Sequence, residues 1–440
     1  MARAVEGAPN CAAPQWNQAN GEMSDRKKLL LIGATTGYQT RVFAEIAERL
    51  DFDLVLATDR CHVLDDPWGD RAIALRFEDP ARAAEVLPAE ARVDGIVAVG
   101  DRPACIASLA AERMRVPYNS PDSVLASRDK FLARERFRCT GLPVPEYFRA
   151  PIAEGPGRAA DRASYPCVLK PLGLSASRGV IRANNRAELV AAFGRIAALL
   201  AEPDIARLHD EQNRFIQVET FIEGRELALE GILLDGRLRV LALFDKPDPL
   251  DGPYFEETIY VTPSRESLET QRDIVRTTER AIQALGLTRG PVHAEMRVNQ
   301  RGVWMLEVAA RPIGGLCARV LPGLEELILR HAAGQNVSSF PMPSDAAAVM
   351  MIPIPREGIY VNAEGLEEAR SVACVEDVII TAKQGQKLLP LPEGNSYLGF
   401  IFARATSPAE AERAVREAHA RLQFEIAAAL PVVQAAGPDR

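Results

Sequence analysis

The sequence predicts an α/β protein in which a doubly wound parallel sheet is followed by a second part made of strand pairs, hairpins and helices. Two observations indicate this fold class. Short apolar runs alternate with helical patterns from Lys27 to about residue 100, as they do in parallel sheets. From residue 165 to about residue 312, turns join apolar strands directly. A length of 440 residues gives room for about two to three domains.

The elements can be assigned in order from their apolar patterns. Strands are predicted over 27–34, 52–58, 72–77 and 93–100, with a helix over 38–50. A helical and then proline-punctuated stretch covers 119–150, and further helices are predicted over 323–334 and from Ser407 onward. Residues 1–24 lack a sustained period, so a disordered tail is expected there, with Met23 as an alternative start of translation.

Charge and cysteine spacing argue against several classes of protein. A net charge of −8 disfavours a nucleic-acid surface, which needs a basic stripe, but it allows one anionic ligand held by local cations. No apolar run approaches the ~20 residues of a membrane-spanning helix, and no secretory leader pattern is seen, so no membrane partner is expected. The seven cysteines form no CxxC pair, which disfavours a zinc site or disulfide framework and favours a reducing, cytoplasmic location.

Residues 291–312, "PVHAEMRVNQRGVWMLEVAARP", predict a β-hairpin that carries two acids. If the loop is 300–302, Gly302 takes the left-handed position that such loops demand. Asn299 then pairs with Val303, Glu295 faces Glu307, and His293 faces Ala309. A register slipped by one residue would put the two acids on opposite faces.

Two carboxylates directly opposite each other repel, so this pairing calls for a positive charge between them. A bridging Mg²⁺ is the favoured interpretation, because this hard ion is commonly bound by one or two carboxylates together with substrate phosphates. The alternative is an exposed sheet face on which the acids pair with Arg297 and Arg311.

The stretch "CVLKPLGLSASRGVIRAN", residues 167–184, predicts a strand ending at Lys170, a loop of small residues and a second strand. Small residues let backbone N–H groups approach phosphate oxygens closely. The loop is not a Walker A motif, since GxxxxGK[ST] is absent from the chain. A lysine that is merely solvated at a strand end is the alternative.

A third motif, "FIQVETFIEGRELALEGIL", begins at Phe215 and turns at Glu223-Gly224. The strand edge beside Glu219 is suited to an adenine ring, and Glu226 to ribose hydroxyls. An amphipathic hairpin with outward-facing acids is the alternative interpretation.

Taken together and in this order, the motifs resemble the ATP-grasp superfamily. The resemblance covers roughly residues 27–405. The residues that carry it are Lys130, Lys170, Ser175, Ser177, Arg178, Gly179, Glu219, Ile222, Gly224, Glu226, Glu295, Glu307 and Arg311. Residues 244–264, with "YLGFIFARA", look most like the L-amino acid ligase branch, which joins unprotected amino acids. Two positions depart from the family pattern: Ala309 stands where a metal-binding asparagine is common, and Ala176 where many relatives have glycine.

The resemblance implies an ATP-grasp fold of two α+β subdomains with the nucleotide between them. The expected division is a tail over 1–24, an N-terminal α/β domain over 25–118, a central subdomain with the phosphate loop over 119–215, and a C-terminal subdomain with the metal and substrate site over 216–440.

The implied activity is that of an ATP-dependent carboxylate–amine ligase acting through an acyl phosphate. Lys130, Lys170 and the loop residues would meet the phosphates, with the adenine near Glu219, Phe221 and Ile222. Glu295 and Glu307 would hold one or two Mg²⁺, for which Mn²⁺ can substitute, and Arg311 would stabilise the oxyanion. Lys170, Glu307 and Arg311 are therefore the predicted catalytic residues. A small-molecule carboxylate and a small-molecule amine are the expected substrates, and a homodimer is the default assembly.

The substrate contacts are less sharply predicted. Gly314 and Gly315 let backbone N–H groups approach a substrate oxygen, although a plain turn explains them equally well. Glu256 and Glu257 are candidates for binding the ammonium group of a substrate. The alternative is that they are exposed acids at the start of a strand. His293 could orient substrate or serve as a hydrogen-bonded structural histidine.

Two other functions remain open at this level. One is a carboxylase-like enzyme that activates bicarbonate, although the chain contains no AMKM-type biotin-acceptor motif. The other is a non-catalytic nucleotide-binding module, which Ala309 would favour because it removes a metal ligand.

Overall fold

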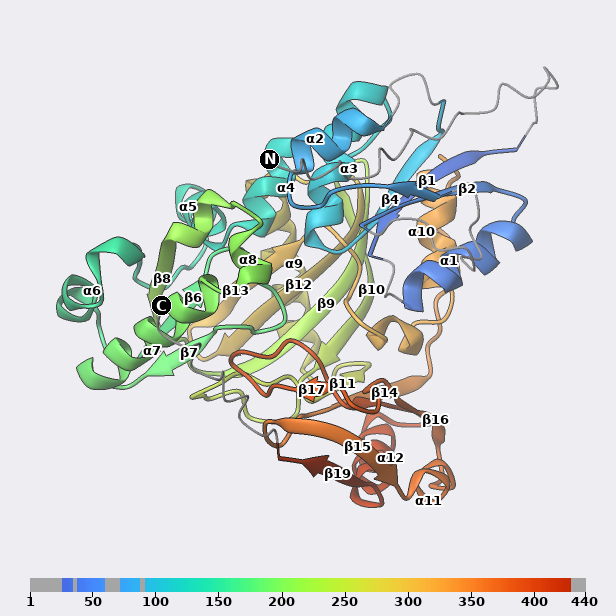
Figure 1. The fold of residues 1–440 in the computed structure, drawn as a ribbon. Helices are drawn as coiled ribbons and strands as arrows, with labels where there is room; N and C mark the ends of the chain where they lie inside the picture. Colours follow the sequence, from blue (N-terminus) through green and yellow to red (C-terminus); the bar gives the residue numbers. More distant parts are fainter. Residues whose placement is uncertain (1–25, 35–37, 60–71, 88–91, 429–440) are drawn as a thin grey trace, which may run out of the picture.

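The computed structural model describes residues 26–34, 38–59, 72–87 and 92–428. The predicted tail over 1–24 and the alternative start at Met23 lie outside these residues. The described chain folds into four sheets, which Figure 1 shows from the parallel N-terminal sheet to the antiparallel sheets of the C-terminal half. The predicted α/β class is confirmed.

The N-terminal sheet has the strand order β3-β2-β1-β4, and all of its pairs are parallel. Its strands are β1 Lys28–Gly33, β2 Asp53–Thr58, β3 Ala72–Ala74 and β4 Gly95–Val99, and its helices are α1 Tyr38–Arg49, α2 Pro80–Val86 and α3 Asp101–Met114. Leu29 and Leu31 of β1 pack on one face and Leu30 and Ile32 on the other, so the strand is an unbroken apolar run.

A helix from the C-terminal half completes one face of this first sheet. Helix α10, Leu324–Ala332, packs against α1 and β4 (Figure 1). The approach is close, because a Cβ atom at Gly95 would lie 2.0 Å from the carbonyl oxygen of Ala332. Glycine at this position of β4 is therefore required by packing.

The central sheet is antiparallel, with the order β5-β8-β6-β7. It consists of β5 Tyr147–Pro151, β6 Cys167–Pro171, β7 Ile181–Ala183 and β8 Phe215–Thr220, with α6 Gly157–Arg162, α7 Arg186–Leu200 and α8 Pro203–Ala206 beside it. Strand β8 pairs along its whole length with β5 and β6, so this sheet extends past the expected boundary at residue 215.

The largest sheet has eight strands in the order β13-β12-β9-β10-β11-β14-β18-β16. They are β9 Arg225–Leu234, β10 Arg237–Asp245, β11 Ile259–Thr262, β12 Gly290–Asn299, β13 Gly302–Ala309, β14 Ala346–Ile352, β16 Val375–Ile380 and β18 Gly399–Ala405. Helices α4 Pro121–Arg128, α5 Lys130–Cys139 and α9 Leu268–Leu285 pack near its β13 end, and α12 Pro408–Ala420 packs on β14 and β18.

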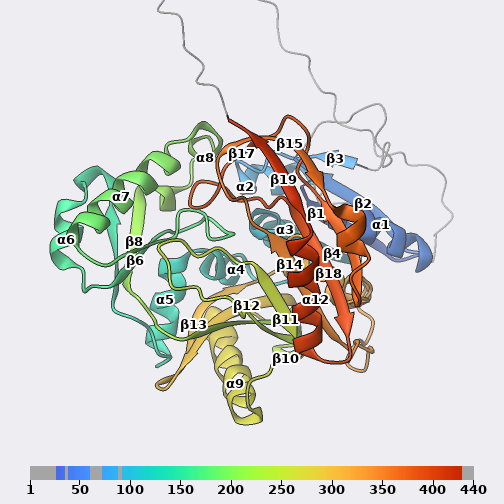
Figure 2. The same cartoon turned by 90° about the horizontal axis from the view of Figure 1, so that it is seen from below.

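A small sheet of β17 Lys387–Leu388, β15 Gly358–Glu364 and β19 Gln423–Ala427 lies near the end of the described chain, with α11 Leu366–Arg370 following β15. Figure 2, seen from below, shows the loop after β17 reaching toward α8 of the central subdomain. Within the described ranges, no helix has both the length and the apolar character needed to cross a membrane.

The hairpin of β12 and β13 corrects one prediction and confirms another. The loop contains two residues, Gln300 and Arg301, so Asn299 pairs with Gly302 and the predicted three-residue loop is wrong. A β-bulge between Met296 and Glu295 then shifts the register back by one residue.

Because of this bulge, Glu295 does face Glu307 and His293 does face Ala309. Leu306 is the additional residue on β13, since Met305 pairs with Met296 and Glu307 with Glu295. Its carbonyl oxygen accepts a hydrogen bond at 3.0 Å from the buried guanidinium of Arg134 on α5, which anchors the bulge.

Candidate active site

A cavity of about 780 Å³ collects most of the predicted site residues. Residues of the N-terminal sheet, the central sheet and the largest sheet all contribute to its walls. The predicted residues among them are Lys130, Lys170, Ser175, Ser177, Glu219, Phe221, Ile222, Glu226, Glu257, His293, Glu295, Glu307, Arg311, Gly314 and Gly315. Three predicted residues, Arg178, Gly179 and Glu256, do not line it.

Lys130 lies at the start of α5, where Asp129 caps the helix by accepting hydrogen bonds from the N–H groups of Phe131 and Leu132. The ammonium of Lys130 lies 3.3 Å from a carboxylate oxygen of Glu307 and donates to the carbonyl oxygen of Leu174 at 2.8 Å. This lysine therefore joins the metal-ligand candidate on β13 to the beginning of the phosphate loop.

Lys170 on β6 pairs with Glu219 on the neighbouring strand β8, and its ammonium contacts one carboxylate oxygen directly. Arg134 donates to the other oxygen at 3.1 Å, and Gln217 donates to the same oxygen at 2.8 Å. Burial would raise the pKa of Glu219, but Arg134 and Lys170 outweigh burial and lower the pKa to about 2. The side chain of Glu219 is thus an ionised anchor for Lys170, which the sequence did not indicate.

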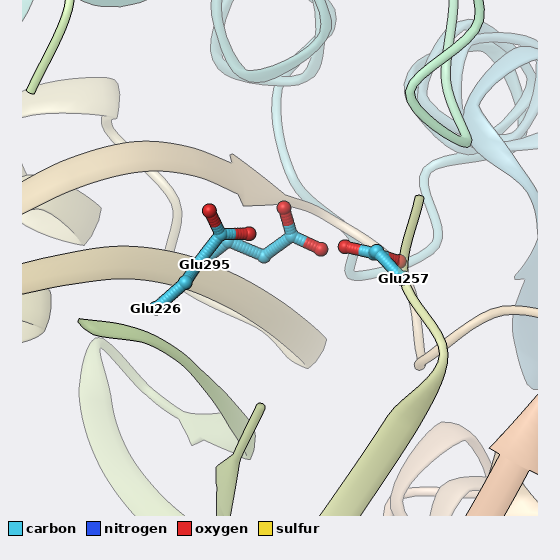
Figure 3. Close-up of side chains that lie close together, drawn as sticks. All are labelled: Glu226, Glu257 and Glu295. Atoms are coloured by element: carbon cyan, nitrogen blue, oxygen red, sulfur yellow. The ribbon is translucent and has the colours of Figure 1, made fainter. Parts of the chain in front are cut away.

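Lys246, near the end of β10, lies among three carboxylates. Its ammonium is 2.9 Å from Glu226 and 3.3 Å from Glu295, and it contacts Glu257 directly. Figure 3 shows the carboxylates of Glu226, Glu257 and Glu295 converging; one oxygen from each lies within 4.8 Å of the others. Burial opposes the charged form of Lys246, but the three acids raise its pKa well above its usual value, so the ammonium stays charged.

These acids are oxygen ligands of the kind that Mg²⁺ prefers, so the residues fit the predicted metal. The arrangement differs from the prediction in one respect. Glu295 faces Glu307 in the hairpin, yet the acids grouped with it are Glu226 and Glu257, while Glu307 contacts Lys130. Ala309 is buried opposite His293 and offers no side-chain ligand.

The two candidate ammonium-binding acids are separated. Glu257 lines the cavity and accepts a hydrogen bond from the hydroxyl of Tyr260 at 3.0 Å. Burial and the charge of Glu295 raise the pKa of Glu257 to about 7, although Lys246 opposes them. Glu256 lies away from the cavity, as alternate side chains of extended backbone do, so its proposed role in gripping substrate loses its basis.

His293 bridges two acids inside the largest sheet. Its Nδ1 lies 3.1 Å from Glu230 and its Nε2 lies 3.3 Å from Glu295. Burial lowers the pKa of the imidazole, but these two hydrogen bonds outweigh burial and raise it to about 9. Glu230 also accepts hydrogen bonds from the N–H of Ile313 at 3.1 and 3.2 Å. This geometry favours a structural role for His293: its hydrogen bond orients Glu295.

Arg311 is held by the N-terminal domain. Its guanidinium donates to both carboxylate oxygens of Asp101, at 2.7 and 3.4 Å, and to the carbonyl oxygen of Pro312 at 3.1 Å. Burial opposes the charge on Arg311, but Asp101 raises its pKa. Asp101 follows β4 at the carboxyl end of the parallel sheet, a position where α/β folds place ligand residues, so a signal for it was available.

Gly314 and Gly315 follow the hairpin at the cavity wall. Gly315 has φ of 62°, and a Cβ atom there would lie 3.5 Å from the ring of Phe400. Gly314 has open space around it. Both glycines are exposed at the cavity wall, and the contact of their N–H groups with a substrate oxygen stays a prediction.

Comparison with known proteins identifies two domains. Residues 163–320 match the ATP-grasp domain, and residues 350–427 match L-amino acid ligase C-terminal domain 2. The crystal structure of L-amino acid ligase from Bacillus licheniformis superposes with a TM-score of 0.78 at 26% identity, covering 92% of this chain and 100% of that chain.

Two curated relatives match over shorter regions. Alanine–anticapsin ligase of Bacillus subtilis is 27% identical over 218 residues, which is 47% of this chain and 45% of that protein. Dapdiamide A synthase of Enterobacter agglomerans is 27% identical over 197 residues, or 43% of each chain. The chain thus spans less than half of the length of these two relatives. The chain therefore contains an ATP-grasp domain and an L-amino acid ligase C-terminal domain, and it shares the fold of an L-amino acid ligase.

Proposed function

We propose that this protein is an ATP-dependent carboxylate–amine ligase that forms an amide bond between two L-amino acids and releases ADP and phosphate. One observation carries the proposal: Glu295 and Glu307 face each other across a hairpin in a cavity that Lys130 and Lys170 also line. Paired acids for a metal beside two lysines for phosphates are what phosphoryl transfer to a carboxylate requires.

In the first step the substrate carboxylate attacks the γ-phosphorus of ATP, which yields an acyl phosphate and ADP. The work of the protein in such a step is chiefly positioning and charge neutralisation. Lys130 and Lys170 approach the phosphates from different elements, and Ser175 and Ser177 bring the phosphate loop to the same wall. Phe221 and Ile222 form the apolar end of the cavity proposed for the adenine.

Glu295 and Glu307 would hold Mg²⁺ or Mn²⁺. A bound divalent ion supplies positive charge that offsets the repulsion between phosphates and attacking carboxylate. His293 and Lys246 keep Glu295 ionised: burial would raise its pKa, but these two cations lower it well below its usual value.

In the second step the amine attacks the acyl carbonyl and phosphate leaves. Arg311, charged and fixed by Asp101, is the proposed donor to the oxyanion. Glu257 is the proposed contact for a substrate ammonium, and the N–H groups of Gly314 and Gly315 are the proposed contacts for a substrate oxygen.

The decisive experiment is a phosphate-release screen over pairwise amino-acid mixtures with mass spectrometry of the product. We expect at least one pair to release phosphate and yield a dipeptide in equal amounts. Bicarbonate-dependent ADP release would instead support the carboxylase-like alternative, and ATP binding in calorimetry without turnover on any pair would support a non-catalytic module.

A cytoplasmic location and a homodimer are parts of the proposal that need their own tests. The free thiols of Cys105, Cys139, Cys167, Cys317 and Cys374 fit a reducing compartment. Light scattering coupled to size exclusion would measure the oligomeric state.

A further inference from the structure

The loop between β17 and β18 connects two regions that are far apart in the sequence. Residues 389–397, called here the clasp segment, belong to the L-amino acid ligase C-terminal domain and contact the phosphate loop, residues 173–179. The N–H of Gly179 donates to the carbonyl oxygen of Pro392 at 2.8 Å, and the guanidinium of Arg178 donates to the carbonyl oxygen of Glu393 at 2.8 Å. The two predicted loop residues that do not line the cavity are therefore the ones that hold the clasp segment.

The carboxylate of Glu393 makes a second connection. Arg195 on α7 donates to both of its oxygens, one of them at 2.8 Å, in the planar forked geometry that favours carboxylates. The same guanidinium contacts the hydroxyl of Tyr254. Glu393 is thus fixed through both its backbone and its side chain. Arg195 is 43% exposed and Glu393 33% exposed, so this ion pair adds little to the free energy of unfolding. Its effect is to fix the position of the clasp segment.

The phosphate loop has a backbone that needs such support. Ala176 and Ser177 have φ of 55° and 53°, in the left-handed region that residues with a Cβ seldom occupy. Conformations of this kind persist when surrounding contacts hold them. A Cβ atom at Gly179 would lie 2.6 Å from the ring of Pro171, and the N–H of Gly179 is bound to Pro392 of the clasp segment.

The far end of the clasp segment reaches the substrate cavity. Asn395, Ser396 and Tyr397 line the same cavity as Ser175 and Ser177 of the phosphate loop. Tyr397 packs edge-to-face on Phe400, with ring centroids 6.0 Å apart, beside Gly315. One short segment therefore touches both the phosphate loop and the part of the wall assigned to the amino acids.

We infer that Glu393 and Arg195 are positioning residues that hold the phosphate loop closed over the activated substrate, and that the C-terminal domain couples this closure to the substrate end of the cavity. The inference rests on the proposed ligase activity. An acyl phosphate survives only while water is excluded. With the clasp broken, a water oxygen adds to the acyl carbon and phosphate leaves, so the free carboxylate is regenerated and ATP is consumed without amide formation.

The first test measures the ratio of ADP to amide formed by the full-length protein. We expect a ratio near one for the wild type and a several-fold higher ratio for Glu393→Gln and for Arg195→Gln, with the KM for ATP little changed. The double variant Arg195→Glu/Glu393→Arg should return the ratio toward the wild-type value. An unchanged ratio in both single variants would overturn the inference.

A matched control comes from Lys387 and Glu357, an exposed pair 3.1 Å apart in the same domain. Glu357→Gln should leave the ratio unchanged, and an equal rise in this variant would count against a specific role of Glu393.

A second readout separates this inference from the proposed function. Hydrogen exchange of residues 173–179 in the presence of ATP and Mg²⁺ reports loop closure without any amide product. We expect faster exchange there in Glu393→Gln than in the wild type. If residues 173–179 exchange equally fast in the wild type and in Glu393→Gln, the positioning role of Glu393 is refuted, whatever product the protein makes. If the wild type forms no amide but the two proteins still differ in exchange, only the proposed ligase activity is refuted.

Discussion

Glu295 and Glu307 face each other on β12 and β13 because a bulge at Leu306 offsets a hairpin loop that is one residue shorter than predicted. Without the bulge, the two acids would point to opposite faces of the sheet. Arg134 anchors the bulge through the carbonyl oxygen of Leu306 and also binds Glu219, so one buried guanidinium fixes both the acidic pair and the partner of Lys170.

The acidic pair gives the first prediction. Glu307→Gln should lower substrate-dependent ADP release by about 100-fold or more, because the amide cannot neutralise a metal ion or the Lys130 ammonium. Circular dichroism should show an unchanged fold, since Glu307 is partly exposed. Glu256→Gln is the matched control and should keep its activity, because Glu256 lies outside the cavity. Retained turnover in Glu307→Gln would refute its role as a metal ligand.

The second prediction concerns Arg311. Arg311→Lys should reduce kcat by about 100-fold, because a compact ammonium lacks the planar fork that binds both oxygens of Asp101 while another N–H faces the oxyanion. Steady-state kinetics would separate this loss from an effect on the KM for ATP, which should change little. Nearly wild-type kcat would show that Arg311 only connects the domains.

The third prediction is a pH dependence of stability. The pKa of His293 in the folded protein, about 9, lies above its usual value of 6.5. The imidazolium therefore stabilises the fold fully below pH 6.5, and this contribution is lost as the pH rises through 9. The difference in unfolding free energy between wild type and His293→Gln should fall by about 3 kcal/mol over this range.

Urea unfolding at both ends of that range would measure the difference. His419→Gln is a suitable control because the pKa of His419 is lowered by burial, so it supplies no such stabilisation. A difference for His293→Gln that does not vary with pH would contradict the assigned hydrogen bonds.

The fourth prediction concerns the buried ammonium of Lys246. Lys246→Met should destabilise the protein by about 3–5 kcal/mol, because Glu226, Glu257 and Glu295 would be left without their shared counter-ion. Lys387→Met removes an exposed lysine and should change stability by about 0.5 kcal/mol or less. Chemical denaturation of both variants measures the contrast, and equal stabilities would show that the three acids do not depend on Lys246.

The sequence predicted what local patterns determine. The strands of the N-terminal sheet are continuous apolar runs, and the helix from Ser407 begins with a capping serine, so both could be assigned from neighbouring residues. Strand β19 could not, because its partner β15 lies far upstream and its own sequence is short and partly polar.

The missed site residues have a common explanation. Lys246, Arg134 and Glu230 acquire their roles only through partners distant in the sequence, so the residues next to them give no signal. The same limit applies to the hairpin: its loop type was misjudged, and the bulge that corrected the register depends on Arg134 from another element.

The packing of α10 against the first sheet has a consequence for synthesis on the ribosome. Leu29, Leu31 and Phe43 emerge early, but Leu327 and Ile328, which share their core, are translated much later. Part of the apolar face of the nascent sheet therefore stays uncovered until α10 has left the exit tunnel. Contacts between segments so far apart in the sequence form slowly, and the apolar surface exposed in the meantime is the kind that chaperones bind. A truncated chain ending before α10 would leave that face permanently open to aggregation.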